Sequence, residues 1–368
     1  MEHSTPSDAG QTPQPVGPMA GAGRPHGSSP APLSVLDLTV VGEGEGAAAA
    51  LERTTALARA AERWGFRRFW VAEHHSFPAS GSPAPAVLLA HLGNVTSTIG
   101  LGSGGVMLTN HAPLVVAEQF GVLNAFHPGR IDLGVGRNPG GLSTVAKALR
   151  RAGGDMSGGD FQAQVEELLG FLNNSFPDDH PYHRDQVHVV PQAPDLPVWT
   201  LGSGTTGAET AARLGLPFAA AFHINPDQAL RAVDLYRDTF RPSGTLPKPY
   251  VMVSVNVTCA PSGQEALYLA RSGALMMMRA RQGRQSAVPA ADTAAQYRCT
   301  PDEQSFVDTW LNAVIHGDPD TIRAGLTDLQ RRTKADELML TTMIHDFDAR
   351  ERSYALVAEE FDLLANGS

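Results

Sequence analysis

Apolar positions along the chain follow two different spacings. Short apolar runs bounded by glycine or proline are typical of buried strands, and apolar residues three and four positions apart are typical of helices with one buried face. Strands are predicted at Leu33–Val40, Phe66–Ala72, Ile99–Leu108, Arg130–Arg137, Pro197–Leu201, Pro217–Phe222, Tyr250–Cys259 and Asp336–Thr342. Helices are predicted at Ala47–Trp64, Ala84–Asn94, Pro113–Phe126, Phe161–Phe171, Thr206–Leu214, Pro226–Phe240, Gln264–Arg281 and Ser353–Leu364.

This alternation of eight strands with helices predicts an α/β fold, a (β/α)8 barrel of the TIM type. We expect one barrel domain over residues 33–368. Residues 1–32 are rich in Gly, Pro, Ser and Ala and contain no apolar segment of a signal peptide, so we expect a disordered leader there. Two long polar insertions, residues 138–160 and about 279–300, interrupt the pattern, and loops of this length are usually functional lids or disordered.

Composition and charge narrow the class of protein. The 368 residues include 28 basic and 38 acidic side chains, which leave a net charge of −10 and no basic block. This balance argues against nucleic acid or an anionic membrane surface as the main partner. No apolar stretch is long enough to cross a bilayer. The two cysteines, Cys259 and Cys299, lack metal-ligand spacing and suit a reducing, cytoplasmic location.

Polar residues stand at the carboxyl ends of several predicted strands, where barrel enzymes place their active sites. The motif Glu73-His74-His75 follows a buried run, although titratable groups are costly to bury. Arg137 ends the fourth strand among glycines, and a guanidinium matches phosphate with a bidentate fork. The Ser203–Thr206 turn leads into a helix, whose unpaired N–H groups also favour phosphate. The pattern predicts a site for an anionic cofactor.

Other interpretations of these motifs are weaker. The glycines of Gly102–Gly105 indicate a bulge or the close approach of a ligand, and the alternative is a barrel corner, where glycine also occurs. Gly202–Gly207 spells G-x-G-x-x-G, with Asp227 at the distance of a ribose-binding acid, but it lies inside an eight-unit alternation and fits a mononucleotide phosphate better than a Rossmann unit. We expect no metal site at His74 and His75, because adjacent strand residues point to opposite faces and a further ligand pair is missing.

Three segments carry several of these residues in a fixed order. They are Phe69-Trp70-Val71-Ala72-Glu73-His74-His75, Gly102-Ser103-Gly104-Gly105-Val106-Met107-Leu108 and Pro128-Gly129-Arg130-Ile131-Asp132-Leu133-Gly134-Val135-Gly136-Arg137. Together they resemble the signatures of the bacterial luciferase-like flavin monooxygenases, over nearly the whole predicted barrel. The resemblance implies a TIM-type barrel that binds FMN, or in one branch of the family the deazaflavin F420, at the strand carboxyl ends.

The resemblance also implies roles for individual residues. His74 matches the catalytic histidine, and Glu73 and His74 would line the flavin pocket. Gly104 and Gly105 match a bulge beside the flavin ring that is often held by a cis peptide bond. We expect Glu73, His74 and His223 to form the catalytic group. The remaining matches are Arg137, Ser203, Gly204, Thr205 and Thr206 at the flavin phosphate, and Phe222 with His223 at a position facing the ring or the substrate.

The implied activity is that of a two-component monooxygenase. A separate flavin reductase would supply FMNH2, which reacts with O2 to a C4a-(hydro)peroxyflavin and oxygenates an organic substrate. The Ala-, Gly-, Arg- and Pro-rich composition is typical of a GC-rich bacterial genome, and by association we expect a role in secondary metabolism, such as antibiotic biosynthesis. Two alternatives stay open: an F420-dependent hydride-transfer enzyme, and a flavin-binding subunit without turnover.

Two further expectations concern the surface. A homodimer is expected through the helices at Ala84–Asn94 and Pro113–Phe126, and the insertion around 279–300 is expected to act as a lid over the site. The run Met276-Met277-Met278 is interpreted as core or lid packing, because methionine fills irregular apolar gaps more often than it marks a cofactor site.

Overall fold

The structure, a computed structural model, describes residues 27–138, 143–149 and 161–363. Within these residues eight parallel strands form a closed barrel, because β10 pairs with β1 on one side and with β8 on the other. The predicted (β/α)8 barrel is confirmed. Around the barrel the strands are β1 (Leu33–Asp37), β2 (Arg68–Val71), β3 (Gly100–Ser103), β5 (Ile131–Gly136), β6 (Val198–Gly202), β7 (Phe218–Ala221), β8 (Val251–Cys259) and β10 (Glu337–Thr341).

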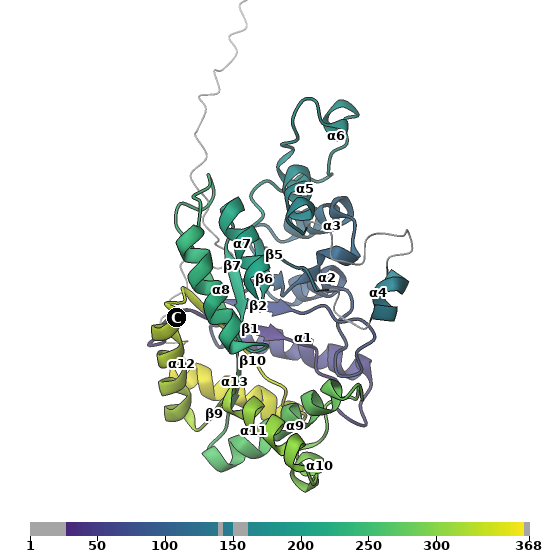
Figure 1. Ribbon diagram of the computed structural model, residues 1–368. Helices are drawn as coiled ribbons and strands as arrows, with labels where there is room; N and C mark the ends of the chain where they lie inside the picture. The colour runs from purple at the N-terminus through teal and green to yellow at the C-terminus, as the bar shows by residue number, and fades with distance from the viewer. Residues whose placement is uncertain (1–26, 139–142, 150–160, 364–368) are drawn as a thin grey trace, which may run out of the picture.

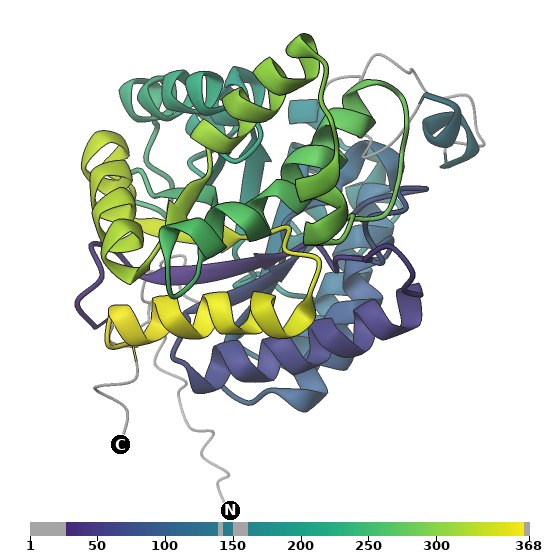
Figure 2. The same ribbon diagram turned by 90° about the horizontal axis from the view of Figure 1, so that it is seen from below.

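Helices surround the barrel and bury its outer face (Figures 1 and 2). The largest apolar cluster lies between the strands and these helices, as expected when each helix covers the sheet with one apolar face. No helix within the described ranges is both long and apolar enough to span a membrane. The surrounding helices are α1 (Ala47–Arg63), α2 (Pro85–Val95), α3 (Pro113–Phe126), α5 (Phe161–Asn173), α7 (Thr205–Leu214), α8 (Pro226–Thr239), α12 (Pro319–Thr333) and α13 (Phe347–Glu360).

The predicted strand Ile99–Leu108 is divided into β3 and a short strand β4 (Val106–Met107). The two pieces are joined by a cis peptide bond between Gly104 and Gly105, as the family resemblance implied. A side chain at Gly105 would meet the backbone, and one at Gly104 would require the Leu36 side chain to move. A Cβ on Gly104 would lie 2.6 Å from Leu36 Cδ1, and one on Gly105 would lie 2.8 Å from a backbone carbonyl oxygen.

The region between β8 and β10 differs from the prediction. After α9 (Gly263–Arg281) the chain forms α10 (Ala291–Gln296), α11 (Pro301–Asn312) and a short strand β9 (Ile315–Gly317), which pairs with the end of β8, before it reaches α12. All four elements, α12 included, were missed, although the capping box formed by Thr300 and Glu303 was readable as a helix start. Likewise α13 begins at Phe347 rather than at Ser353, because the Asp346 side chain caps it.

The ends of the predicted barrel domain also need adjustment. Residues 27–32, assigned to the leader, already pack on the barrel: Ser29 and Ala31 are buried, and the Ser28 N–H donates to the Phe361 carbonyl at 2.8 Å. The rest of the predicted leader, residues 1–26, lies outside the described residues. So does much of the insertion at 138–160, of which the helix α4 (Ser143–Leu149) is described.

A buried ion-pair network fills the barrel interior at the amino ends of the strands. Arg68 Nη1 donates to Asp132 Oδ2 at 2.6 Å, and Arg68 Nε donates to Glu337 Oε1 at 2.9 Å, with all three side chains fully buried. The indole N–H groups of Trp70 and Trp199 donate to Asp132 as well. Every charge in this network therefore has an opposite charge and further hydrogen bonds, which is the condition for burying charge at tolerable cost.

Candidate active site

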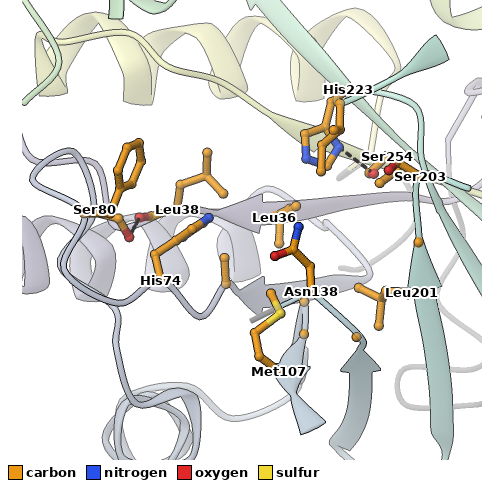
Figure 3. Close-up of a pocket in the computed structure, with 18 of the residues that line it drawn as sticks. Leu36, Leu38, His74, Ser80, Met107, Asn138, Leu201, Ser203, His223 and Ser254 are labelled. Carbon is orange, nitrogen blue, oxygen red and sulfur yellow. Dashed lines mark hydrogen bonds between the residues drawn. The ribbon is translucent and has the colours of Figure 1, made fainter. Parts of the chain in front are cut away.

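A cavity of about 540 Å³ opens at the carboxyl end of the barrel. Its wall comes from strands and from the loops that follow them, so residues far apart in the sequence meet there. Figure 3 shows His74 and Ser80 on one side of this space, and Asn138, Ser203 and His223 on the other. The base of the cavity is mostly apolar and includes Leu36, Ala72, Gly104, Gly105, Leu201, Ala219 and Met339.

His74 lies at the end of β2 and lines the cavity. Its backbone N–H donates to the Ser82 carbonyl at 2.9 Å, and its ring lies 5.6 Å from that of Phe77. Its Nδ1 atom is buried and has no hydrogen-bond partner among the described residues. Burial lowers the pKa of His74, and the nearby Glu73 carboxylate only partly offsets this. His74 is therefore neutral near pH 7 and keeps a ring nitrogen that no protein group uses.

His223 follows β7, and its ring faces the cavity on one side and Ser254 on the other. Its Nδ1 atom lies 2.8 Å from Ser254 Oγ, and that hydroxyl also donates to the Ala220 carbonyl at 3.2 Å. Because the serine proton is used on Ala220, the serine oxygen accepts from His223 Nδ1–H. Burial lowers the pKa of His223 to about 4, and neighbouring His74 adds to the effect. A neutral ring protonated on Nδ1 leaves Nε2 as a hydrogen-bond acceptor.

Ser254 was missed by sequence reasoning, although a signal was present. β8 reads Val251-Met252-Val253-Ser254-Val255-Asn256, with valine at every second position and larger or polar residues between. Since side chains alternate across a strand, Met252, Ser254 and Asn256 share one face. Polar residues on the inward face of a fully buried strand were the available clue.

Glu73 does not line the cavity, contrary to expectation. It is fully buried, and its Oε1 accepts hydrogen bonds from His75 Nε2 at 2.7 Å and from His111 Nε2 at 2.9 Å. Its Oε2 accepts from the Met107 N–H at 3.0 Å. Burial alone would raise the pKa of Glu73, but these hydrogen bonds outweigh it and hold the pKa below its usual value. Glu73 therefore orients His75, which does line the cavity.

The side chains of Glu73, His75 and His111 are grouped as metal ligands would be, although no metal site was expected at His74 and His75. That expectation assumed that His75 lacks further ligands, whereas Glu73, His75 and His111 offer three ligand atoms within 4.8 Å of one another. Hydrogen bonds from the two rings to one carboxylate oxygen account for this geometry without a metal ion. The contact with His111 was invisible in the sequence because the turn after β4 brings that residue to β2.

Polar groups gather at the end of the cavity formed by β5 and β6. The exposed guanidinium of Arg137 lines it and makes no ion pair with the side chains that the structure describes. Helix α7 begins here, and its N-cap residue Gly204 offers no side chain to the first N–H groups. Ser203 and Thr206 line this end too. The predicted Thr205 and Phe222 are not among the lining residues, and Phe222 packs into the apolar core instead.

Apolar side chains form the opposite end of the cavity. Met276 and Met277 pack with Val288 of the predicted lid, as expected, and they also line the cavity, while Met278 belongs to a separate apolar cluster. Gln285 and Val288 of the predicted lid also line it, and Val288 exchanges backbone hydrogen bonds of 2.9 and 2.8 Å with the loop after β1. The other apolar lining residues at this end are Val40, Phe77, Ala79, Trp310 and Met343.

Comparison with known proteins places these features in a family. The family model described as luciferase-like monooxygenase matches residues 32–335. The chain is 42% identical over 329 residues to a luciferase-like monooxygenase of Escherichia coli (strain K12), covering 89% of this chain and 96% of that protein. It is 34% identical over 329 residues to the N-acetyl-S-alkylcysteine monooxygenase of Bacillus subtilis (strain 168), covering 89% and 97%.

Solved structures agree with this placement. The crystal structure of apo-MsnO8 superposes with a TM-score of 0.81 at 37% identity, over 92% of this chain and 98% of that one. The FMN complex of the oxygenating constituent of 3,6-diketocamphane monooxygenase from Pseudomonas putida gives 0.65 at 17% identity, over 91% and 98%. The F420-dependent tetrahydromethanopterin reductase from Methanopyrus kandleri gives 0.62 at 15%, over 90% and 98%. At such low identity the last two show the fold alone.

Proposed function

This chain belongs to the luciferase-like monooxygenase family and is an enzyme, and we propose that it uses FMNH2 and O2 to oxygenate a small organic substrate. The observation that carries the proposal is that one cavity contains both a set of unpaired phosphate-binding groups at one end and two neutral histidines, His74 and His223, that face its interior. A related structure of the same fold is an FMN complex. A separate flavin reductase is the proposed source of FMNH2.

The residues present fit a flavin mononucleotide. Arg137 is a cation without a described ion-pair partner, and the first turn of α7 presents N–H groups without a side-chain cap. Both favour a phosphate, one through charge and the other through unpaired donors and the helix dipole. Gly104 and Gly105 leave backbone, rather than side chains, at the base of the cavity where a flat ring can approach closely. We propose that these groups hold FMN, with Ser203 and Thr206 as additional hydroxyl donors.

We propose that His74 and His223 exchange protons or hydrogen bonds with the reacting groups. Bound reduced flavin supplies the electrons that activate O2. His74 keeps Nδ1 free of protein partners, so this atom can exchange a proton with a reacting group, and we propose it as the acid/base. His223 offers Nε2 as an acceptor, because Ser254 fixes its other nitrogen. The apolar walls exclude water, which strengthens these interactions.

The test of the phosphate site is Arg137→Ala. A charge-assisted contact is worth roughly 1.5–3 kcal/mol, so the FMN and FMNH2 dissociation constants should rise about 10- to 100-fold with the fold intact. Arg213→Ala, at the opposite end of α7 and exposed, is the matched control and should bind like the parent. Unchanged flavin affinity in Arg137→Ala would place the phosphate elsewhere.

The F420-dependent alternative is tested in the same titration. Structural relatives of the same fold include F420-dependent enzymes. Tight binding of F420 with weak binding of FMN would replace the monooxygenase proposal with hydride transfer. Oxygen uptake with FMNH2 and formation of an oxygenated product would in turn contradict a subunit without turnover.

We also propose a homodimer through α2 and α3. Some apolar side chains of these two helices are buried against the barrel, among them Leu88, Leu89 and Phe120. Four other side chains on these helices remain exposed, and they are Val87, Val115, Val122 and Phe126, with exposed fractions from 41% to 74%. Apolar side chains gathered on two adjacent helices suit an interface with a second copy. Light scattering that gives a monomer mass at micromolar concentration would contradict this.

A further inference from the structure

The two ends of the cavity offer different chemistry to a ligand. Hydrogen-bond donors and the cation Arg137 stand at the β5–β6 end, near the start of α7. The other end, between the loops after β1 and β2 and the helix α9, is lined by aliphatic, aromatic and thioether side chains. If the proposed function is correct, the flavin phosphate occupies the first end, and the second end receives the substrate.

Few polar groups are available at the apolar end. The Ser80 hydroxyl donates to the Leu38 carbonyl at 2.7 Å, so its proton is already used (Figure 3). The other polar side chains at this end among the described residues are Gln285 and the indole of Trp310, and His74 and His75 stand at its border with the rest of the cavity. Aliphatic and thioether atoms cannot compensate the lost hydration of an ion or of a strongly polar group.

Two charged side chains beside the apolar end are paired with each other outside the cavity. Arg279 Nη1 lies 2.9 Å from Glu43 Oε1, and neither residue is part of the lining. This ion pair joins the end of α9 to the loop after β1, beside the backbone hydrogen bonds between Val288 and that loop. The pair therefore closes the apolar end from outside and offers no counter-ion to its interior.

His74 and His223, which face the cavity between the two ends, are neutral as well. Each carries a pKa below its ordinary value because burial disfavours the charged ring. A carboxylate or an ammonium group at the apolar end would therefore be desolvated without an opposite charge. His223 Nε2, in contrast, can accept a hydrogen bond from a hydroxyl or amide group.

We propose that the substrate is an uncharged, mainly apolar molecule, whose body contacts Met276, Met277, Met343 and Val288 and which carries no ionised group at the end that is oxygenated. This rests on the proposed function for its catalytic consequence. Methionine side chains adapt to different apolar shapes, so the wall selects for the absence of charge more than for one outline.

The test uses three probes of equal length that differ in charge: 1-octanol, octanoate and octylammonium. Calorimetric titration of the full-length protein, with and without saturating FMN, should show 1-octanol binding at least about tenfold more tightly than either ion. Tighter or equal binding of either ion would overturn the proposal, and so would the failure of all three probes to bind.

Variants locate the effect at the apolar end. Met277 is partly exposed to the cavity, so Met277→Glu should weaken 1-octanol at least about tenfold and strengthen octylammonium, whereas Met277→Leu should leave the order of the probes unchanged. Arg271→Glu, exposed on the same helix away from the cavity, is the control for a charge change. Unchanged probe affinities in Met277→Glu would overturn the assignment of this wall.

FMN affinity is measured in the same preparation, which separates the two proposals. If 1-octanol binds as expected and FMN does not, the apolar subsite stands and the flavin-dependent function falls. If FMN binds and octanoate is preferred over 1-octanol, the flavin function stands and the inference about the substrate falls.

Discussion

The two ends of the barrel interior treat buried polar groups in opposite ways. At the amino end, Arg68 is held between Asp132 and Glu337, and tryptophan N–H groups complete the network. At the carboxyl end, His74 keeps an unpartnered Nδ1 and His223 keeps a free Nε2, and both rings are neutral. The same set of strands carries both arrangements, a few residues apart.

This difference distinguishes residues that stabilise the fold from residues that can react with a ligand. Charges that are fully paired in the interior recover their desolvation cost through each other and have nothing left to offer a ligand. Neutral titratable groups that face a cavity with unused atoms are available to a substrate, and such groups cluster at functional sites. The pairing of a buried polar group, rather than its burial, distinguishes the two ends.

The largest effect is expected at the amino end. Arg68→Ala leaves Asp132 and Glu337 buried without their cation, which should lower the free energy of unfolding by about 3–5 kcal/mol. Urea denaturation measures this, with the exposed Arg213→Ala as the control that should change little. A loss of less than about 1 kcal/mol would contradict the structural role assigned to this network.

An alanine substitution at the carboxyl end should lower activity and leave stability nearly unchanged. His74→Ala removes the proposed acid/base, so product formation per FMNH2 should fall about 10²- to 10⁴-fold while the urea midpoint and the FMN affinity stay near those of the parent. Single-turnover assays with excess FMNH2 measure the first quantity. Unimpaired product formation would make His74 a structural residue and remove the contrast between the two ends.

Glu73 lies at the carboxyl end of the barrel, but its carboxylate is fully paired like the charges at the amino end. Glu73→Gln places an N–H₂ group against either the histidine donors or the Met107 N–H, so at least one hydrogen bond is lost, at a cost of about 1–3 kcal/mol. Because His75 lines the cavity, the pH dependence of turnover should shift as well, which a purely structural role would not cause. An unchanged pH profile, with only stability lowered, would assign Glu73 to support alone.

The last test concerns pH, and its effect is small over any single pH unit. The pKa of His223 is about 4 in the folded protein against 6.5 ordinarily, so between these values the unfolded chain binds a proton that the folded chain does not. Stability should therefore fall as pH drops from about 6.5 towards 4, with a limit of about 1.4 kcal/mol per pH unit for one site. Urea midpoints at several pH values measure the slope, and His223→Gln should reduce it. A slope that is the same in both proteins would show that His223 is not the neutral group described.

The sequence by itself determined the repeating architecture and the family. The helix Pro113–Phe126 was predicted with the bounds that the structure has, because its proline start and its apolar spacing are local properties. The strand ends that carry His74, Arg137 and Ser203 were likewise readable, since a barrel brings all carboxyl ends to one face whatever the register.

Tertiary structure alone decided which polar groups are paired. Arg68 reaches Glu337 across 269 positions of sequence, and Glu73 meets His111 across 38, so neither contact follows from a local pattern. The same holds for Met276 and Met277, whose helix faces the cavity only because the chain returns over the barrel mouth. Local periodicity determines which side of a strand or helix is buried. The closure of the barrel determines which residues that side contacts. Those contacts leave one buried polar group fully hydrogen-bonded and another free to react.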